Sequence, residues 1–191
     1  AENAASLDWI TNGNYVLGVG LGYRPEEFEA LGVEFEQRVS RFEEAIPLIR
    51  RLWNEKSVTH HGRHFNISGL GASIKPKRAG GPPIWVGGDV IAAVQRAAKL
   101  NCPWIAPPTM TFHEIVERVE VYRKISAEIS SNSVNEQPII REVAIGKTKA
   151  DALRAARPAL LSKYEAYASW GQTATKEQVS LSDTFDDFIK D

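Results

Sequence analysis

Cysteine is almost absent from this sequence: Cys102 is the single example among 191 residues. One thiol excludes a framework of intrachain disulfides, and it also excludes a zinc site built from several cysteines. So few cysteines suit a reducing compartment, where thiols are not oxidised. We therefore expect a cytoplasmic location.

An excess of charge of either sign is also missing. Lysine and arginine number 23 against 24 aspartates and glutamates, which leaves a formal net charge of -1. Such a balance gives no long-range field that would favour nucleic acid or an anionic membrane surface. Long apolar runs are missing as well, because none approaches the roughly 20 residues that span a bilayer. We expect neither a nucleic-acid partner nor a membrane.

The clearest local pattern is a strand, a glycine turn and a helix start. Residues 84–86 read Ile-Trp-Val, an apolar run typical of a parallel strand buried on both faces. Gly87 and Gly88 follow, and then Asp89, which is a good N-cap for the next helix. Free N–H groups at such a helix start favour a phosphate. The pattern equally fits an ordinary strand-to-helix turn, so both interpretations stay open.

Strands and helices alternate along the chain. We expect parallel strands at residues 15–19, 84–86, 104–106 and 138–145, a hairpin at 58–67, and helices after Pro25, Asp89, Thr111 and Thr148. This alternation predicts an α/β fold with right-handed crossovers. Four strands fit a small doubly wound sheet or part of a (β/α)₈ barrel, since a complete barrel needs about 250 residues. Residues 1–10 read as a helix already under way, so we expect a piece of a longer chain.

A glycine-rich segment follows the first expected strand and invites a dinucleotide-binding interpretation. The dinucleotide fingerprint is Gly-x-Gly-x-x-Gly, and Gly18 and Gly20 match its first two glycines. Its third glycine position is Tyr23 here, and no acidic residue closes a second strand about 20 residues on. We favour a strand end at which Gly20 and Gly22 let a flat ring lie against the backbone.

Three histidines, His60, His61 and His64, could suggest a metal site. On a hairpin they would point to both faces, and no cysteine or nearby acidic group completes a ligand set. We therefore expect a solvated hairpin and no metal. Basic side chains in the following loop could contact an anion, although short charged loops are usually just solvated: Lys75, Lys77 and Arg78.

Three further side chains are candidates for a substrate pocket. Arg141 is a lone cation in an apolar strand, so it must pair with a neighbouring strand or loop, or point into a polar cavity. Tyr23 and Glu27 come just after a strand end, where active sites of α/β folds gather. For Glu27, an ordinary helix-start role competes with a functional one.

Six longer stretches carry a more specific pattern: residues 17–32, 38–53, 61–65, 82–88, 140–143 and 163–172. In their wording and order they closely resemble the luciferase-like flavin-dependent oxidoreductases. The resemblance covers nearly the whole chain and is more specific than any single motif. It implies a (β/α)₈ TIM barrel, of which residues 1–191 form one partial domain with strands 4 to 7, while strands 1 to 3 and 8 are absent.

The resemblance also implies a cofactor, either FMN or the deazaflavin F420 in reduced form, at the C-terminal face of the barrel. The residues implied to seat its phosphate are Gly87, Gly88, Asp89 and Val90, with Gly20 and Gly22 along the ring. Three positions depart from the family pattern: Asn14, Leu21 and Cys102. Leu21 stands where bacterial luciferase has an arginine that contacts the phosphate, so that contact would be lost here. Catalytic side chains from the first strands are not in this chain, and residues 169–182 would correspond to a mobile lid.

The resulting hypothesis is a flavin- or F420-dependent oxidoreductase, a monooxygenase acting on a small organic substrate. A flavin reductase and further copies of the chain are its implied partners, and this part of the barrel alone is expected to be inactive. The alternative hypothesis is a non-catalytic barrel fragment that acts as a binding or assembly module, because half a barrel leaves sheet edges unpaired. A Rossmann dehydrogenase is a distant third.

Overall fold

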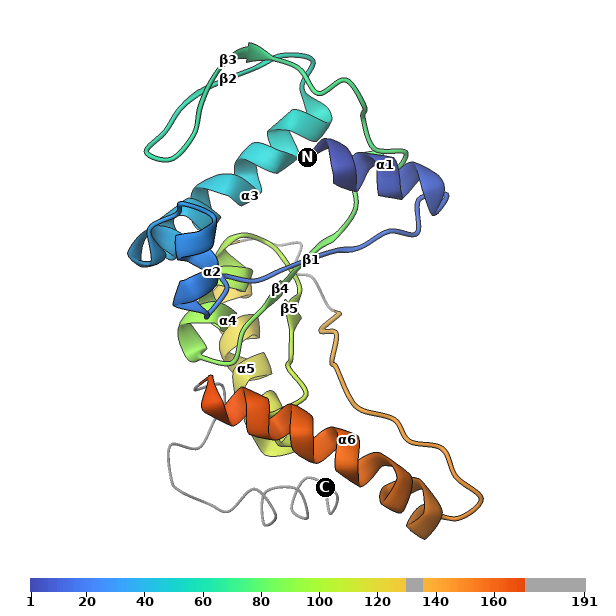
Figure 1. The fold of residues 1–191 in the computed structure, drawn as a ribbon. Helices are drawn as coiled ribbons and strands as arrows, with labels where there is room; N and C mark the ends of the chain where they lie inside the picture. Colours follow the sequence, from blue (N-terminus) through green and yellow to red (C-terminus); the bar gives the residue numbers. More distant parts are fainter. Residues whose placement is uncertain (130–135, 171–191) are drawn as a thin grey trace.

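The structure is a computed structural model, and it describes residues 1–129 and 136–170. Its elements, in chain order, are α1 (Glu2–Ile10), β1 (Leu17–Val19), α2 (Pro25–Ala30), the 3₁₀ turn η1 (Phe35–Gln37), α3 (Arg38–Asn54), β2 (Val58–His61), β3 (Asn66–Leu70), β4 (Ile84–Gly87), α4 (Ile91–Lys99), β5 (Trp104–Ile105), α5 (Phe112–Ile129) and α6 (Lys149–Ser169) (Figure 1). Within these residues no helix is long and apolar enough to cross a bilayer.

A three-stranded parallel sheet in the order β1–β4–β5 lies at the centre of the fold. Leu17 pairs with Ile84 and Val86 pairs with Trp104, so the strands run side by side with their C-terminal ends at one edge. The α/β class and the parallel sheet expected from the alternating pattern are confirmed. Each strand is short, and α4 provides the crossover from β4 to β5.

The expectation that residues 84–86 are buried on both faces is wrong. Ile84 and Val86 are buried, whereas Trp85 between them is only half-buried, and its partner Gly18 on β1 is exposed. Successive side chains of a strand point to opposite faces. The sheet therefore packs one face densely against helices and leaves the other face more open.

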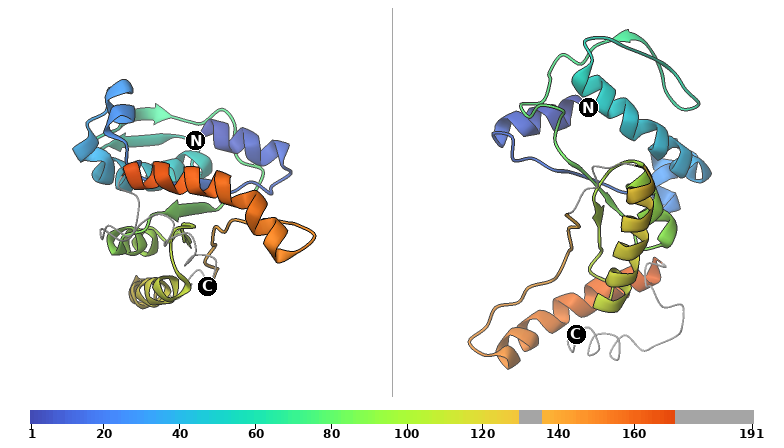
Figure 2. Two further views of the ribbon diagram at one scale, coloured as in Figure 1. Left: turned by 60° about the horizontal axis from the view of Figure 1, so that its bottom comes forward. Right: turned by 180° about the vertical axis from the view of Figure 1, so that it is seen from behind.

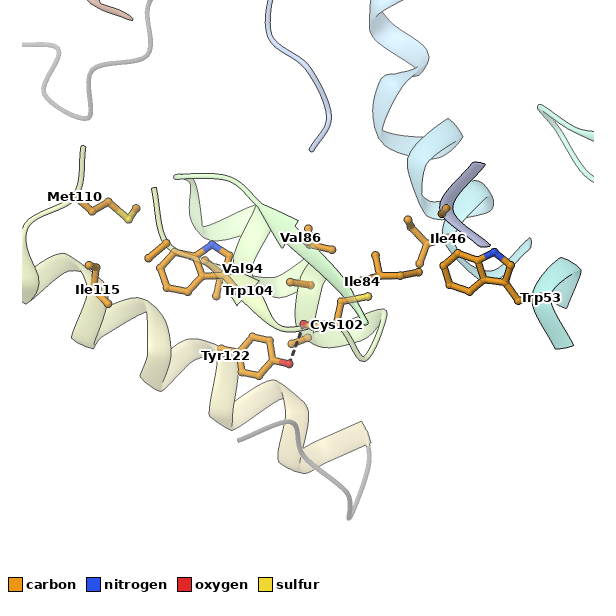
Figure 3. Packing of buried hydrophobic residues seen from close by; sticks show 14 of the residues in the cluster. Ile46, Trp53, Ile84, Val86, Val94, Cys102, Trp104, Met110, Ile115 and Tyr122 are labelled. Carbon is orange, nitrogen blue, oxygen red and sulfur yellow. Dashed lines mark hydrogen bonds between the residues drawn. The ribbon is translucent and has the colours of Figure 1, made fainter. Parts of the chain in front are cut away.

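The packed face carries the hydrophobic core (Figure 3). Trp104 and Tyr122 are its largest fully buried side chains, and the Tyr122 hydroxyl donates a hydrogen bond of 2.9 Å to the Cys102 carbonyl oxygen. Apolar residues of α4 and α5 cover this face. The core members from these helices and from β5 with its flanking residues are Val94, Ala97, Ala98, Cys102, Trp104, Ala106, Ile115 and Tyr122.

The hairpin expected at residues 58–67 is confirmed as the antiparallel pair β2–β3, which stands apart from the central sheet (Figure 1). Several side chains of α3 contact it, and Glu44 makes the most hydrogen bonds. The Glu44 carboxylate lies 2.8 Å from His60 Nε2 and accepts hydrogen bonds of 2.9 and 3.0 Å from the backbone N–H groups of His64 and Phe65. The hairpin is thus fixed to α3 by polar contacts.

The fourth strand expected at residues 138–145 does not form. In the described chain this segment makes one parallel bridge, between Ala106 and Ile139, and Val143 and Ile145 are exposed. A strand needs a partner along its length, and β5 has only two residues to offer. The residues have strand composition, but the sheet supplies no continuing neighbour here.

Helix starts follow the sequence closely, with one exception. The helix expected after Thr111 begins with a capping box, with bonds of 2.9 Å from Thr111 N to Glu114 Oε2 and 3.3 Å from Glu114 N to Thr111 Oγ1. Thr148 caps α6 by accepting from Asp151 N. Asp89 is not the N-cap of α4: the cap is Val90, and no side chain caps that helix. The chain turns one residue later than expected.

Candidate functional site

The expected cofactor residues meet at the C-terminal edge of the sheet. Because β1 and β4 are parallel neighbours, the glycine segments that follow them emerge side by side. A Cβ placed on Gly20 would lie 4.0 Å from the carbonyl oxygen of Gly87. In α/β folds ligands bind outside the carboxyl ends of the strands, so the structure brings both glycine segments to the place where a ligand is expected.

The segment from Gly88 to Val90 is held by two side chains from the packed face. Trp104 Nε1 donates to the Gly88 carbonyl oxygen at 2.8 Å, and Arg118 Nε donates to the Asp89 carbonyl oxygen at 3.0 Å. Across the described residues, no group accepts a hydrogen bond from the backbone N–H of Asp89 or Val90. The Gly88 N–H faces β5, because Gly87 and Ile105 are partners in the parallel ladder. The carbonyls are fixed while the N–H groups at the start of α4 remain available to an anion.

Gly88 has a local reason to be glycine. Its φ is +156°, and a Cβ there would lie 2.5 Å from the Ala93 Cβ in α4. The missing side chain lets α4 begin close to the end of β4. Gly22 is required in a similar way, since its φ is +78° and a Cβ would lie 2.9 Å from the Phe28 ring in α2. Close packing is therefore enough to explain why both positions are glycine, and a role with a ligand would come in addition.

The three expected pocket residues do not form one cluster of side-chain contacts. Glu27 pairs with Arg24 at 3.1 Å on the exposed side of α2, which is the helix-start role that competed with function. The Tyr23 ring packs near Trp170, with 6.1 Å between ring centroids. Both nevertheless come shortly after β1 in the chain: Tyr23 follows Gly22 directly, and Glu27 lies in the first turn of α2.

Arg141 contacts a neighbouring loop. Its guanidinium donates to the carbonyl oxygens of Met110 at 3.0 Å, Pro107 at 3.3 Å and Ile140 at 2.9 Å. Of the two alternatives for this arginine, pairing with a loop is what the structure shows. The loop in question is the one that follows β5, so Arg141 fixes the third strand end of the same edge.

The histidines of the hairpin have partners other than a metal. His60 pairs with Glu44, and His64 Nε2 lies 2.8 Å from Ser40 Oγ. Among the described residues, no group of three or more histidines, cysteines, aspartates or glutamates is placed to hold a metal ion. Cys102 is also unsuited to nucleophilic chemistry, because burial raises the pKa of its thiol.

The basic loop after the hairpin is structural, and sequence reasoning missed its partner. Asp8 of α1 is fully buried and accepts a 2.7 Å hydrogen bond from the Arg78 backbone N–H. Lys77 contacts Asn12, and Lys75 Nζ donates to the Leu52 carbonyl oxygen at 2.7 Å. These contacts leave none of the three cations directed to the strand ends. Asp8 shares a helical face with the buried Ala4 and Ala5, a spacing that could have revealed it.

The structure is thus an α/β protein with a parallel sheet, and two glycine segments lie together at the C-terminal edge of that sheet. The sequence model of the luciferase-like monooxygenase family matches residues 1–184. The chain belongs to this family. The resemblance noted in the sequence is thereby confirmed.

Two curated relatives illustrate the match. Phthiodiolone/phenolphthiodiolone dimycocerosates ketoreductase from Mycobacterium kansasii is 29% identical over 154 residues, which are 79% of this chain and 42% of that protein. The FMNH(2)-dependent dimethylsulfone monooxygenase from Pseudomonas fluorescens (strain Pf0-1) is 33% identical over 104 residues, 53% of this chain and 28% of that protein. The chain spans less than half the length of the curated relatives it matches.

Solved structures show the same fold. Monooxygenase RslO1 from Streptomyces bottropensis superposes with a TM-score of 0.81 at 20% identity, over 99% of this chain and 55% of that one. An F420-dependent secondary alcohol dehydrogenase, solved with an F420-acetone adduct, gives a TM-score of 0.67 at 18% identity, over 99% of this chain and 58% of that one. The chain thus corresponds to a little over half of each of these enzymes.

Proposed function

We propose that the chain is the central part of a flavin- or F420-dependent oxidoreductase that acts as a monooxygenase on a small organic substrate. The observation that carries this proposal is the pair of available N–H groups at Asp89 and Val90, which follow β4 at the C-terminal edge of the sheet, where Gly20 lies beside the Gly87 carbonyl oxygen. The family membership and the FMNH(2)-dependent relative support the same cofactor class. Because its relatives are enzymes, a non-catalytic assembly module is the weaker alternative.

The residues present fit the phosphate end of such a cofactor. The backbone of Gly87, Gly88, Asp89 and Val90 would hold the phosphate, because the N–H groups and the partial positive charge of the α4 start favour an anion. The cradle depends on the missing Cβ of Gly88, and Trp104 and Arg118 fix its carbonyls from behind. Once bound, the reduced cofactor supplies electrons for oxygen insertion or hydride transfer.

The remaining edge residues would shape the rest of the site. Gly20 and Gly22 would allow the ring to approach the backbone after β1. Tyr23 and Glu27 would border the substrate side, and Arg141 would contribute by holding the loop after β5. In this proposal the protein positions the ring and substrate and keeps water away from them.

The wider architecture is part of the proposal. Parallel strands β1, β4 and β5 would correspond to strands four to six of a (β/α)₈ barrel, and residues 138–145 to the seventh. Strands one to three and eight, with the catalytic side chains they carry, would come from the longer protein. A flavin reductase and a second copy of the chain are proposed partners, in a cytoplasmic setting. The expected lid, residues 169–182, falls mostly outside the described residues.

Substitution of Gly88 tests the phosphate assignment. In the full-length enzyme, Gly88→Asp should abolish flavin binding through bulk and like charge, as measured by a flavin titration. Gly88→Asn is the matched control, because it has nearly the same size without the charge. We expect weaker binding for asparagine than for the parent and still weaker binding for aspartate. Unchanged affinity in Gly88→Asp would reject the assignment.

A second pair of variants separates charge from folding. Val90 is 58% exposed, so a carboxylate there does not crowd the core. Val90→Asp should lower FMN affinity relative to Val90→Asn, while thermal unfolding of the two variants stays alike. Equal FMN affinity of these two variants would argue against a phosphate at the start of α4.

A further inference from the structure

Three aromatic side chains meet where the C-terminal end of α6 reaches the segment between β1 and α2. Tyr23, Tyr167 and Trp170 form this aromatic cluster, with 6.1 Å between the centroids of Tyr23 and Trp170 and 6.1 Å between those of Tyr167 and Trp170. The rings are tilted by 38° and 46°. Figure 2 shows the end of α6 beside the N-terminal part of the chain.

The aromatic cluster borders the strand-end site. Tyr23 lies three residues after Gly20, on the segment that leaves β1. The Arg24 guanidinium lies 5.1 Å from the Trp170 ring centroid and is paired with Glu27. Lys163 Nζ likewise lies 5.4 Å from the Tyr167 ring centroid and is paired with Glu142, so the charge of each cation on the cluster is balanced.

Two rings of the cluster are exposed, and other contacts hold α6 in place. Tyr23 and Trp170 are 40% and 42% exposed, whereas Tyr164, which lies on α6 before the cluster, is buried. Lys163 Nζ pairs with Glu142 at 2.5 Å, and Thr148 caps the helix start. Anchoring of α6 is therefore provided by Tyr164 and Lys163, and it does not account for two large aromatic surfaces at the rim of a site.

We propose that the aromatic cluster determines substrate specificity, and that it selects substrates with a flat aromatic ring. This inference rests on the proposed function, since it places the substrate next to a cofactor at the strand ends. Tyrosine and tryptophan rings give large contact areas and favour edge-to-face or offset contacts with another ring. A flat ring can lie against the faces of two tilted rings of the cluster. A puckered aliphatic ring of equal size makes poorer contact with the same two faces.

Two ketones with the same carbon skeleton and carbonyl group test the inference: acetophenone, which is flat, and cyclohexyl methyl ketone, which is puckered. Their dissociation constants are measured by equilibrium dialysis against the full-length enzyme, with and without FMN. We expect tighter binding of acetophenone to the parent. Trp170→Ala should weaken acetophenone binding about threefold to tenfold and change that of the aliphatic ketone by less than about twofold.

Controls separate recognition from a structural role. Trp170→Phe keeps an aromatic ring and should retain most of the preference, and Phe112→Ala removes a 71% exposed ring on another helix and should change neither constant. Equal weakening of both ketones by Trp170→Ala, or a parent without preference, would overturn the inference. Loss of FMN affinity in Trp170→Ala would also overturn it, because the indole would then contact the cofactor. If the parent binds no flavin but prefers acetophenone, the proposed function fails, while recognition of a flat ring by the aromatic cluster is retained.

Discussion

Residues 1–129 and residues 136–170 are organised in different ways. In the first region α3, α4 and α5 each bury several side chains, and together with α1 and the sheet they form one hydrophobic core. In the second region the 21-residue helix α6 buries Tyr164 alone, and the extended segment before it exposes Val143 and Ile145. One region is stabilised mainly by packing, and the other mainly by local and surface contacts.

The difference between the two regions reflects where helices and strands find partners for their backbone hydrogen bonds. A helix satisfies its backbone hydrogen bonds within itself, so Thr148 and the favourable residues of α6 are enough to define it. A strand satisfies them only against another strand. Residues 138–145 have strand composition but contact β5 through one bridge, and they remain extended without becoming a strand.

Removal of Trp104 should have the largest effect on the first region. The side chain is fully buried and its indole N–H holds the Gly88 carbonyl oxygen. Trp104→Ala should lower the free energy of unfolding by about 3–5 kcal/mol, measured by urea titration. Trp104→Phe keeps most of the volume and loses the N–H donor, so a smaller loss is expected. A loss below about 1 kcal/mol for alanine would contradict the described core.

A matched pair of valines compares the two regions directly. Val86 is 1% exposed in β4 and Val143 is 83% exposed in the extended segment. Val86→Ala should cost about 1–3 kcal/mol of unfolding free energy, and Val143→Ala should stay within about 0.5 kcal/mol. Both values come from the same urea titrations. Equal costs would show that residues 138–145 are packed in solution, and the contrast between the regions would disappear.

The smallest of these effects concerns the polar contacts of the hairpin in the first region. Burial raises the pKa of Glu44, but hydrogen bonds from His60 and from the backbone N–H of His64 and Phe65 outweigh it and lower the pKa to about 2. A carboxylate with a lowered pKa stabilises the fold above its unfolded pKa of about 4.3, and this contribution is lost as the pH falls through 2.

Glu44→Gln should therefore be less stable than the parent at neutral pH. The gap between their urea midpoints should stay constant above about pH 5 and close as the pH falls from about 4.3 to 2. Ser40→Ala is a suitable control, because it removes a contact of His64 and leaves Glu44 in place. A gap that does not change over this pH range would show that the Glu44 contacts do not stabilise the hairpin.

Much of the fold follows from local sequence patterns. The capping box at Thr111, the cap at Thr148, the proline at the start of α2 and the hairpin all form as predicted, because neighbouring residues decide them. The parallel pairing of β1, β4 and β5 follows from their alternation with helices. These features need no knowledge of distant contacts.

Features that depend on distant residues were not predicted. The failed strand at residues 138–145 has the right composition and lacks a partner, and Asp8 binds the Arg78 backbone across 70 residues. Asp89 looked like a cap, yet close approach of Gly88 to Ala93 sets the start of α4 at Ile91. The glycines of the candidate site were identified from the sequence, while the contacts of Trp104 and Arg118 behind them required the structure.

The pairing of Leu17 with Ile84 has a consequence for how the chain folds. These residues are far apart in sequence, so closing the loop between them costs considerable chain entropy. The β2–β3 hairpin lies inside that loop and joins residues close in sequence, which allows it to form on a microsecond timescale. Once formed, the hairpin and α3 shorten the flexible chain between Leu17 and Ile84. We therefore expect these two elements to form first and the glycine-lined edge of the sheet to assemble last.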